Sequence, residues 1–199
     1  MQRAGVAPAF FFWWAARAVA VAALLAAVAC APRFDWRELK PPAQGYVVAL
    51  PGKPQQVSRQ IAFEHPGGAV QAEMTMLSTG LGASLFAVGS VRLPAHAIDT
   101  PAALGATLAW FADGLLRNVQ AVSATLAEAP PVPGASTRTV RAARAFAVPG
   151  KANDGRPATL AVRLYVVDDR LFQLVALGAE GEIPPAALDT FFDSFRLTP

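Results

Sequence analysis

A two-residue alternation of apolar side chains near the C-terminus is the feature that most constrains the fold. Between Thr159 and Val167, leucine or valine stands at every second position, and Asp168-Asp169 ends the pattern. A second apolar run follows over residues 170–177. Side chains on a strand point alternately to opposite faces, and a two-residue break suits a tight turn. The segment therefore predicts an antiparallel hairpin with one face in a core.

Turn signals divide the chain from residue 45 into further strands and two helices. Thr100-Pro101 is a helix start, and apolar residues follow at helical spacing to about Asn118. Pro184-Pro185 opens a second helix, whose buried face carries several phenylalanines. The other predicted strands cover residues 46–50, 57–63, 70–78, 85–93, 122–127 and 139–148. We expect one α+β domain over residues 45–199, mainly an antiparallel sheet packed with two amphipathic helices.

The first 29 residues are a strongly apolar segment with Arg3 and Arg17 as their only charged side chains. A positive start, an apolar run over residues 18–28 and small residues at its end are typical of a signal peptide. The alternative is a membrane anchor over about residues 8–29, which places Arg17 near mid-membrane at a cost of about 2.5–3.5 kcal/mol. Both alternatives imply export. Residues 30–44, with three prolines, are expected to be a linker.

The only cysteine, Cys30, directly follows Leu25-Ala26-Ala27-Val28-Ala29. This stretch resembles a bacterial lipoprotein box, although Ala27 stands where leucine is usual. The resemblance implies lipid attachment at Cys30 and a membrane tether on the periplasmic side of a bacterial cell envelope. If the N-terminal segment is retained as an anchor, Cys30 has no such role.

Charge and composition argue against several kinds of partner. Of 17 basic residues, Arg3 and Arg17 lie in the N-terminal segment, which leaves 15 against 14 acidic residues. The remaining chain has no basic block, so we expect no nucleic-acid partner. One cysteine and two histidines provide no spaced ligand set, so we expect no metal site and no cofactor.

Four stretches of the sequence carry a family resemblance. Gly45-Tyr46-Val47-Val48-Ala49-Leu50-Pro51-Gly52-Lys53-Pro54, the hairpin of residues 161–174 and Phe191-Phe192-Asp193-Ser194-Phe195-Arg196-Leu197 are similar to small bacterial envelope proteins with a PsbP-like α/β/α sandwich. The strand of residues 83–92 followed by the helix of residues 101–118 matches their order. The resemblance implies the fold and no catalytic residues, because this fold serves unrelated roles.

No set of residues in the sequence has the pattern of an enzyme. His65 in a Pro-Gly-Gly turn and His96 are expected to be surface or loop residues, so we expect no catalytic site. Met74 and Met76 lie on an apolar strand face and are expected in the core.

Arginines on predicted strands are the candidate binding surface for an anion or an acidic partner. The candidates are Arg138, Arg144 and Arg163. Regular alternation places Arg138 and Arg144 on one face of their strand and Arg141 on the other. The alternative is a solvated face, or ion pairs with Glu73, Glu128 or Asp154.

We therefore expect a non-enzymatic, membrane-tethered envelope protein that binds a partner or assists assembly. The alternative is a periplasmic carrier that holds a small apolar ligand or lipid in a cleft between sheet and helix. The apolar residues on both faces of the strand over residues 85–93 motivate this alternative.

Overall fold

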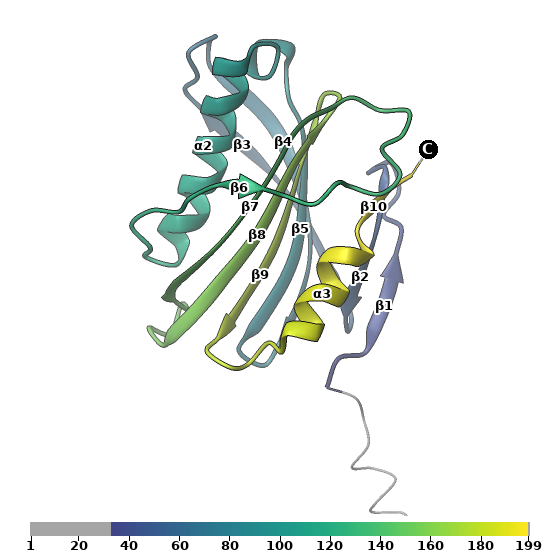
Figure 1. Ribbon diagram of the computed structural model, residues 1–199, viewed down its shortest axis with the longest axis vertical. Coiled ribbons are helices and arrows are strands. Elements are labelled where there is room, and N and C mark those ends of the chain that lie inside the picture. Colours follow the sequence, from purple (N-terminus) through teal and green to yellow (C-terminus); the bar gives the residue numbers. More distant parts are fainter. Residues whose placement is uncertain (1–32, 199) are drawn as a thin grey trace, which may run out of the picture. The chain divides into compact units, whose positions relative to one another are not determined.

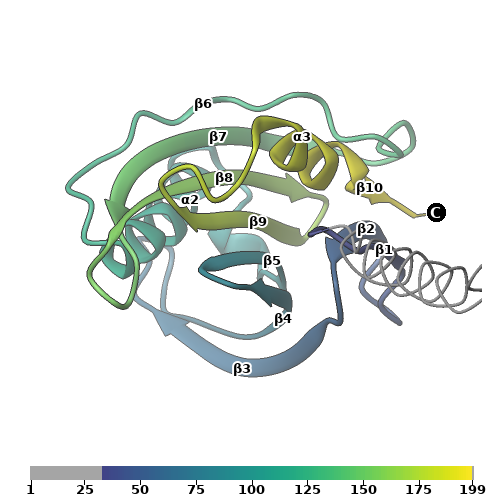
Figure 2. The ribbon, with the colours of Figure 1, turned by 90° about the horizontal axis from the view of Figure 1, so that it is seen from below.

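Seven antiparallel strands form the main sheet, in the order β3-β4-β5-β9-β8-β7-β6 (Figure 1). They are β3 (Gln55–Phe63), β4 (Val70–Leu81), β5 (Ser84–Arg92), β6 (Ala127–Glu128), β7 (Val140–Lys151), β8 (Pro157–Val167) and β9 (Arg170–Ala179). The computed structural model describes residues 33–198. Figure 2 shows that the sheet curves strongly between β3 and β7. The predicted α+β class with a mainly antiparallel sheet and two helices is confirmed.

The three-stranded sheet consists of β1 (Trp36–Leu39), β2 (Tyr46–Pro51) and β10 (Arg196–Leu197), with β2 in the middle. Part of the predicted linker is therefore a strand. The rings of Phe34 and Trp36 stack with centroids 5.8 Å apart, and both meet the ring of Phe86 edge-on. A strand of four residues is too short to show a clear alternation, so the prolines around it dominate the sequence pattern.

Helix α2 (Pro101–Asn118) covers one face of the seven-stranded sheet. Thr100 Oγ1 accepts a hydrogen bond from the Ala103 N–H at 3.1 Å, and Pro101 begins the helix where its missing N–H costs nothing. Phe111 and Leu115 are buried against the sheet. The cap and the apolar stripe thus act as the sequence predicts.

Helix α3 (Pro185–Ser194) packs on the opposite face of the main sheet, in the core that the three-stranded sheet also lines. The ring of Phe195, just after the helix, stacks on that of Tyr165 with centroids 5.9 Å apart. Successive residues of a strand point to opposite faces, so β9 contributes to both cores. Leu171 and Val175 lie in the core under α2, whereas Phe172 and Leu174 lie in the core under α3.

The structure departs from the predicted strands at two places: one predicted strand is mostly unpaired, and another contains an extra residue. Of the predicted strand over residues 122–127, only Ala127–Glu128 pairs with β7, and Val122 is almost fully exposed. In β7, Val140 pairs with Val167 and Ala142 with Val166, so Arg141 is an extra residue that forms a β-bulge.

The predicted signal peptide or anchor over residues 1–29 and the lipid attachment at Cys30 lie outside the described residues. Within residues 33–198, no helix has the length and apolar character to cross a membrane.

Candidate ligand-binding cleft

A cleft of about 530 Å³ lies between the second half of α2 and strands β3, β4, β5, β8 and β9. We call it the α2 cleft. Most of its lining is apolar, and its volume falls in the range of small-molecule sites. The apolar lining includes Met74, Met76, Leu85, Trp110, Phe111, Leu115, Val175 and Leu177.

Small residues on β5 leave space at the base of the α2 cleft. Ala87 lines the cleft, and Gly89 is the next residue on the same face of β5. The flexible side chain of Met74 extends from β4 over Gly89, into the space that a Cβ there would need. Met74 is buried, as predicted, but Met76 is only half-buried and lines the open part of the cleft.

Gln173 is the polar group in the floor of the α2 cleft. Its side chain lies among apolar neighbours on β9, and the residue is only 5% exposed. Its amide makes no hydrogen bond to any residue from 33 to 198, although a glutamine amide offers two donors and an acceptor. The amide atoms are not sealed from solvent, so they face the open part of the cleft, where water can hydrogen-bond them. This amide is therefore available to hydrogen-bond a molecule that enters the cleft.

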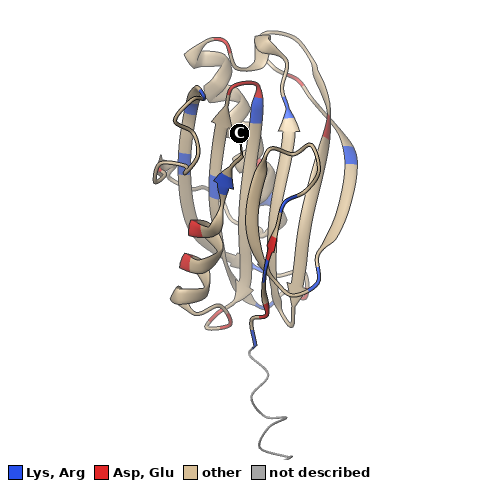
Figure 3. Ribbon diagram, turned by 90° about the vertical axis from the view of Figure 1, so that its right-hand side faces the viewer, with Lys and Arg blue, Asp and Glu red and all other residues tan. Residues whose placement is uncertain are grey.

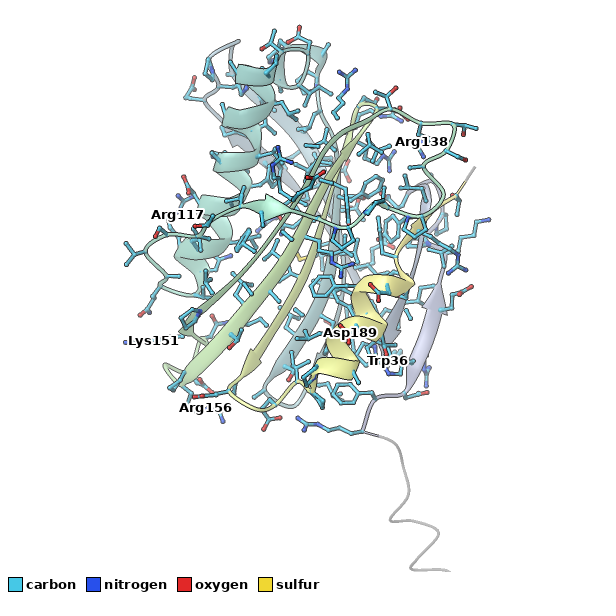
Figure 4. The ribbon with its side chains drawn as sticks, in the orientation of Figure 1. Trp36, Arg117, Arg138, Lys151, Arg156 and Asp189 are labelled. Atoms are coloured by element: carbon cyan, nitrogen blue, oxygen red, sulfur yellow. The ribbon has the colours of Figure 1, made fainter. Side chains whose placement is uncertain are left out.

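The rim of the α2 cleft is polar and positively charged. Arg59 approaches from β3, Arg117 and Asn118 from the last turn of α2, and Asn153 from the turn between β7 and β8. Figure 4 shows Arg117 on the outer part of α2. No aspartate or glutamate lines this cleft.

A second groove of about 680 Å³ lies on the other side of α2, against residues 122–126 and β7. Its charged residues have both signs: Asp99 and Asp113 on one side, and Arg141 and Arg144 on β7. The mixed charges select no ligand class, so the α2 cleft is the stronger candidate.

The structure does not bring Arg138, Arg144 and Arg163 together. Arg138 Nε donates to Asp168 Oδ2 at 2.7 Å. Arg163 lies 3.2 Å from Asp193 Oδ1 and 4.8 Å from the ring centre of Phe192 on the α3 face. Arg144 lines the second groove instead. Figure 3 likewise shows acidic and basic residues interspersed rather than gathered.

The expected faces and ion pairs of these arginines also need correction. Arg141 and Arg144 line the same groove, because the bulge at Arg141 shifts the alternation that regular counting assumes. The ion-pair partners of Arg138 and Arg163 are Asp168 and Asp193, whereas Asp154 pairs with Arg156. Figure 4 shows Arg138 on the side of the domain away from Arg117.

Hydrogen bonds lower the pKa of the Asp168 carboxyl. The main causes are the Arg138 bond and the Thr139 N–H, which donates to Oδ1 at 2.9 Å. Arg141 Nε also donates to the Asp168 carbonyl at 2.8 Å. Asp168 thus ties the β8–β9 turn to the start of β7, which gives Arg138 a structural role.

His65 is in a loop, as predicted, but it is buried rather than on the surface. Its Nδ1 accepts a hydrogen bond from the Gly67 N–H at 3.0 Å, so its Nε2 carries the proton and donates to the Ala103 carbonyl at 2.9 Å. Nδ1 therefore stabilises the loop itself, and Nε2 holds the loop on α2. Residues 33–198 contain no group of three metal-ligating side chains.

Sequence reasoning missed the residues that distinguish the α2 cleft: Arg59, Arg117 and Gln173. Gln173 left a visible signal, since it is the one polar residue in the inward-facing series Leu171, Gln173, Val175 and Leu177. The two arginines left none, because strand β3 and helix α2 are far apart in sequence. No model of a known protein family and no curated protein matches the chain, so its function is inferred from this geometry.

Proposed function

We propose that this chain is a non-enzymatic binding protein whose α2 cleft takes a small, largely apolar molecule with one hydrogen-bonding group. The observation that carries the proposal is the unpaired Gln173 amide in an otherwise apolar floor. Apolar walls supply affinity through burial, and a few convergent polar groups orient the ligand. This favours the carrier alternative of the sequence over a role in assembly.

We also propose that the protein is held at a membrane of the bacterial cell envelope, on the periplasmic side. The sequence of residues 25–30 supports lipid attachment at Cys30. The fold we propose is a PsbP-like sandwich, and the placement of α2 and α3 on opposite faces of the sheet supports it. The intact mass of protein extracted from bacterial membranes tests the tether. A mass of residues 30–199 plus diacylglyceryl and acyl groups supports lipidation, and an unprocessed mass overturns it.

Methionine methyl groups provide a direct test of ligand binding. The chain has three methionines, and Met74 and Met76 both line the α2 cleft. The full chain, labelled with methyl-¹³C methionine and placed in phosphatidylcholine nanodiscs, is titrated with octan-1-ol. We expect saturable shifts of the Met74 and Met76 signals, which are assigned by Met74→Leu and Met76→Leu. Absence of any saturable shift of these signals overturns the proposal.

The substitution Gln173→Leu tests whether the Gln173 amide binds ligand or has a structural role. Leucine has similar volume and needs no hydrogen bond, and the Gln173 amide has no hydrogen-bond partner in the described chain, so the variant is expected to unfold with a free energy no lower than that of the parent. The same change is expected to weaken octan-1-ol binding about fivefold to tenfold, the worth of one hydrogen bond. A variant that is less stable but binds octan-1-ol normally would show that the amide is structural.

A further inference from the structure

The charged residues at the rim of the α2 cleft have no carboxylate partner. Arg59 and Arg117 form no ion pair with any residue of the described chain, although both are exposed and near the cleft. By contrast, six other arginines pair with an aspartate or glutamate: Arg37, Arg92, Arg138, Arg156, Arg163 and Arg196. The positive charge at this rim is therefore not neutralised locally.

The surrounding elements keep acidic groups away from this rim. Glu73 is next to Met74 on β4 and so points to the opposite face of the sheet. Asp113, one turn before Arg117, lines the second groove on the other side of α2. A ligand that carries an anion thus meets two cations and no carboxylate at the opening.

The dimensions of the sheet limit the length of such a ligand. Arg59 is on β3 and Gln173 on β9, three strands apart in the sheet. Neighbouring strands lie about 4.8 Å apart, so these backbones are separated by about 14 Å along the sheet. Strand side chains stand roughly perpendicular to the sheet, so most of this span lies between the two polar ends, and a chain of about eight carbon atoms fits within it.

We infer that the α2 cleft selects a short, single-chain carboxylate amphiphile. Its carboxylate lies at Arg59 and Arg117, its apolar chain lies over Met74 and Met76, and a hydrogen-bonding group at its far end meets Gln173. This inference rests on the proposed function and adds the charge and length of the ligand. Guanidinium groups suit this role because they bind carboxylates with paired, charge-assisted hydrogen bonds.

Two probes that differ only at one end test the inference. They are 8-hydroxyoctanoate and octane-1,8-diol, each titrated against the methyl-labelled full chain in phosphatidylcholine nanodiscs. We expect the Met74 and Met76 signals to report affinity about tenfold or more higher for the carboxylate, as charge-assisted hydrogen bonds would give. The preference should shrink as salt is added, because both arginines are exposed.

Substitutions at the rim identify the source of the preference. Arg59→Gln and Arg117→Gln are each expected to lower affinity for 8-hydroxyoctanoate severalfold, and the double variant to remove the preference over the diol. Arg37→Gln removes the same charge from β1, which does not line the cleft, and is expected to change neither affinity. Full preference in the double variant overturns the inference.

The outcomes also distinguish this inference from the proposed function. Equal, saturable binding of both probes overturns the anionic ligand but supports an apolar one. No saturable shift with either probe overturns both. Adding phosphatidylglycerol to the nanodiscs tests a bilayer lipid as the anion. Unchanged affinity for the carboxylate supports a free single-chain ligand, and strong competition by phosphatidylglycerol overturns the single-chain assignment.

Discussion

The end of the Met74 side chain lies over Gly89, where a Cβ at position 89 would have to stand. Met74 and Gly89 are on neighbouring strands and face the same core under α2. The glycine therefore lets a long, flexible side chain lie flat on the sheet and leaves the α2 cleft open above it. This packing relationship underlies our first prediction.

Gly89→Ala is expected to push the Met74 side chain into the α2 cleft. Overpacking of this kind costs about 1–3 kcal/mol of unfolding free energy, and the narrowed cleft should bind octan-1-ol more weakly. Urea denaturation of the full chain measures the first effect, and the methionine methyl titration measures the second. The cost should be smaller when Met74→Ala is present, because the alanine then has room.

Gly105→Ala is the matched control for this prediction. Gly105 lies in α2, and a Cβ there would meet nothing within 4 Å. Alanine is about 0.8–1 kcal/mol more favourable than glycine in a helix interior, so this variant should be more stable than the parent protein. Equal destabilisation by the two glycine substitutions would contradict the packing argument.

The neutral His65 ring is expected to carry its proton on Nε2. The Gly67 N–H occupies Nδ1, and only a protonated Nε2 donates to the Ala103 carbonyl. Long-range ¹H–¹⁵N correlation spectra distinguish the two tautomers, and a protonated Nδ1 in the neutral ring would refute the assignment. His65→Leu should lower the unfolding free energy by about 1–3 kcal/mol, because it removes two hydrogen bonds, of which the bond to Ala103 is buried.

Asp168 is expected to make stability depend on acid pH. Its hydrogen bonds from Arg138 and Thr139 lower its pKa in the folded state, so its contribution is complete above the unfolded pKa of about 3.9. That contribution is lost as the pH falls through the lower folded pKa. Asp168→Asn tolerates the positive φ of 53° and should be less stable than the parent at pH 7.

Thermal melts of both proteins between pH 7 and pH 2 measure this effect. The difference in melting temperature should be constant near neutrality and should shrink below about pH 4. Asp189→Asn is the control, because Asp189 is exposed on α3 and makes no ion pair within the described chain. A difference between Asp168→Asn and the parent that stays constant down to pH 2 would argue against the carboxylate as its cause.

Gly134 is expected to be indispensable for closing the C-terminal strand. Its φ is +81°, and a Cβ there would collide with the Leu197 carbonyl of β10. Leu197 also donates its N–H to the Pro133 carbonyl at 2.9 Å, so the backbone has little freedom to move. Gly134→Ala should therefore cost more than the roughly 1–3 kcal/mol of backbone strain alone.

Gly155→Ala isolates the backbone part of that cost. Gly155 has nearly the same φ, +80°, but a Cβ there would meet nothing within 4 Å. Urea denaturation should show a clearly larger loss of stability for Gly134→Ala. Similar losses for the two variants would mean that the contact with Leu197 is accommodated.

The sequence by itself determined the type and approximate position of most helices and strands. Alternation over residues 159–167, the turn at Asp168-Asp169 and the Thr100-Pro101 start are local signals, and each element formed where they predict. Such signals succeed because side-chain period and helix capping depend on residues a few positions apart. They failed over residues 122–126, which do not pair with β7, whereas Ala127 and Glu128 do.

Only the tertiary structure decided which side chains share a site. Counting along a regular strand misplaced Arg141, because one extra residue in β7 shifts the alternation, and local cues did not show that His65 is buried. The α2 cleft joins Arg59, Arg117 and Gln173 from elements far apart in the chain. Their proximity depends on strand order and on how α2 crosses the curved sheet, which no local pattern encodes.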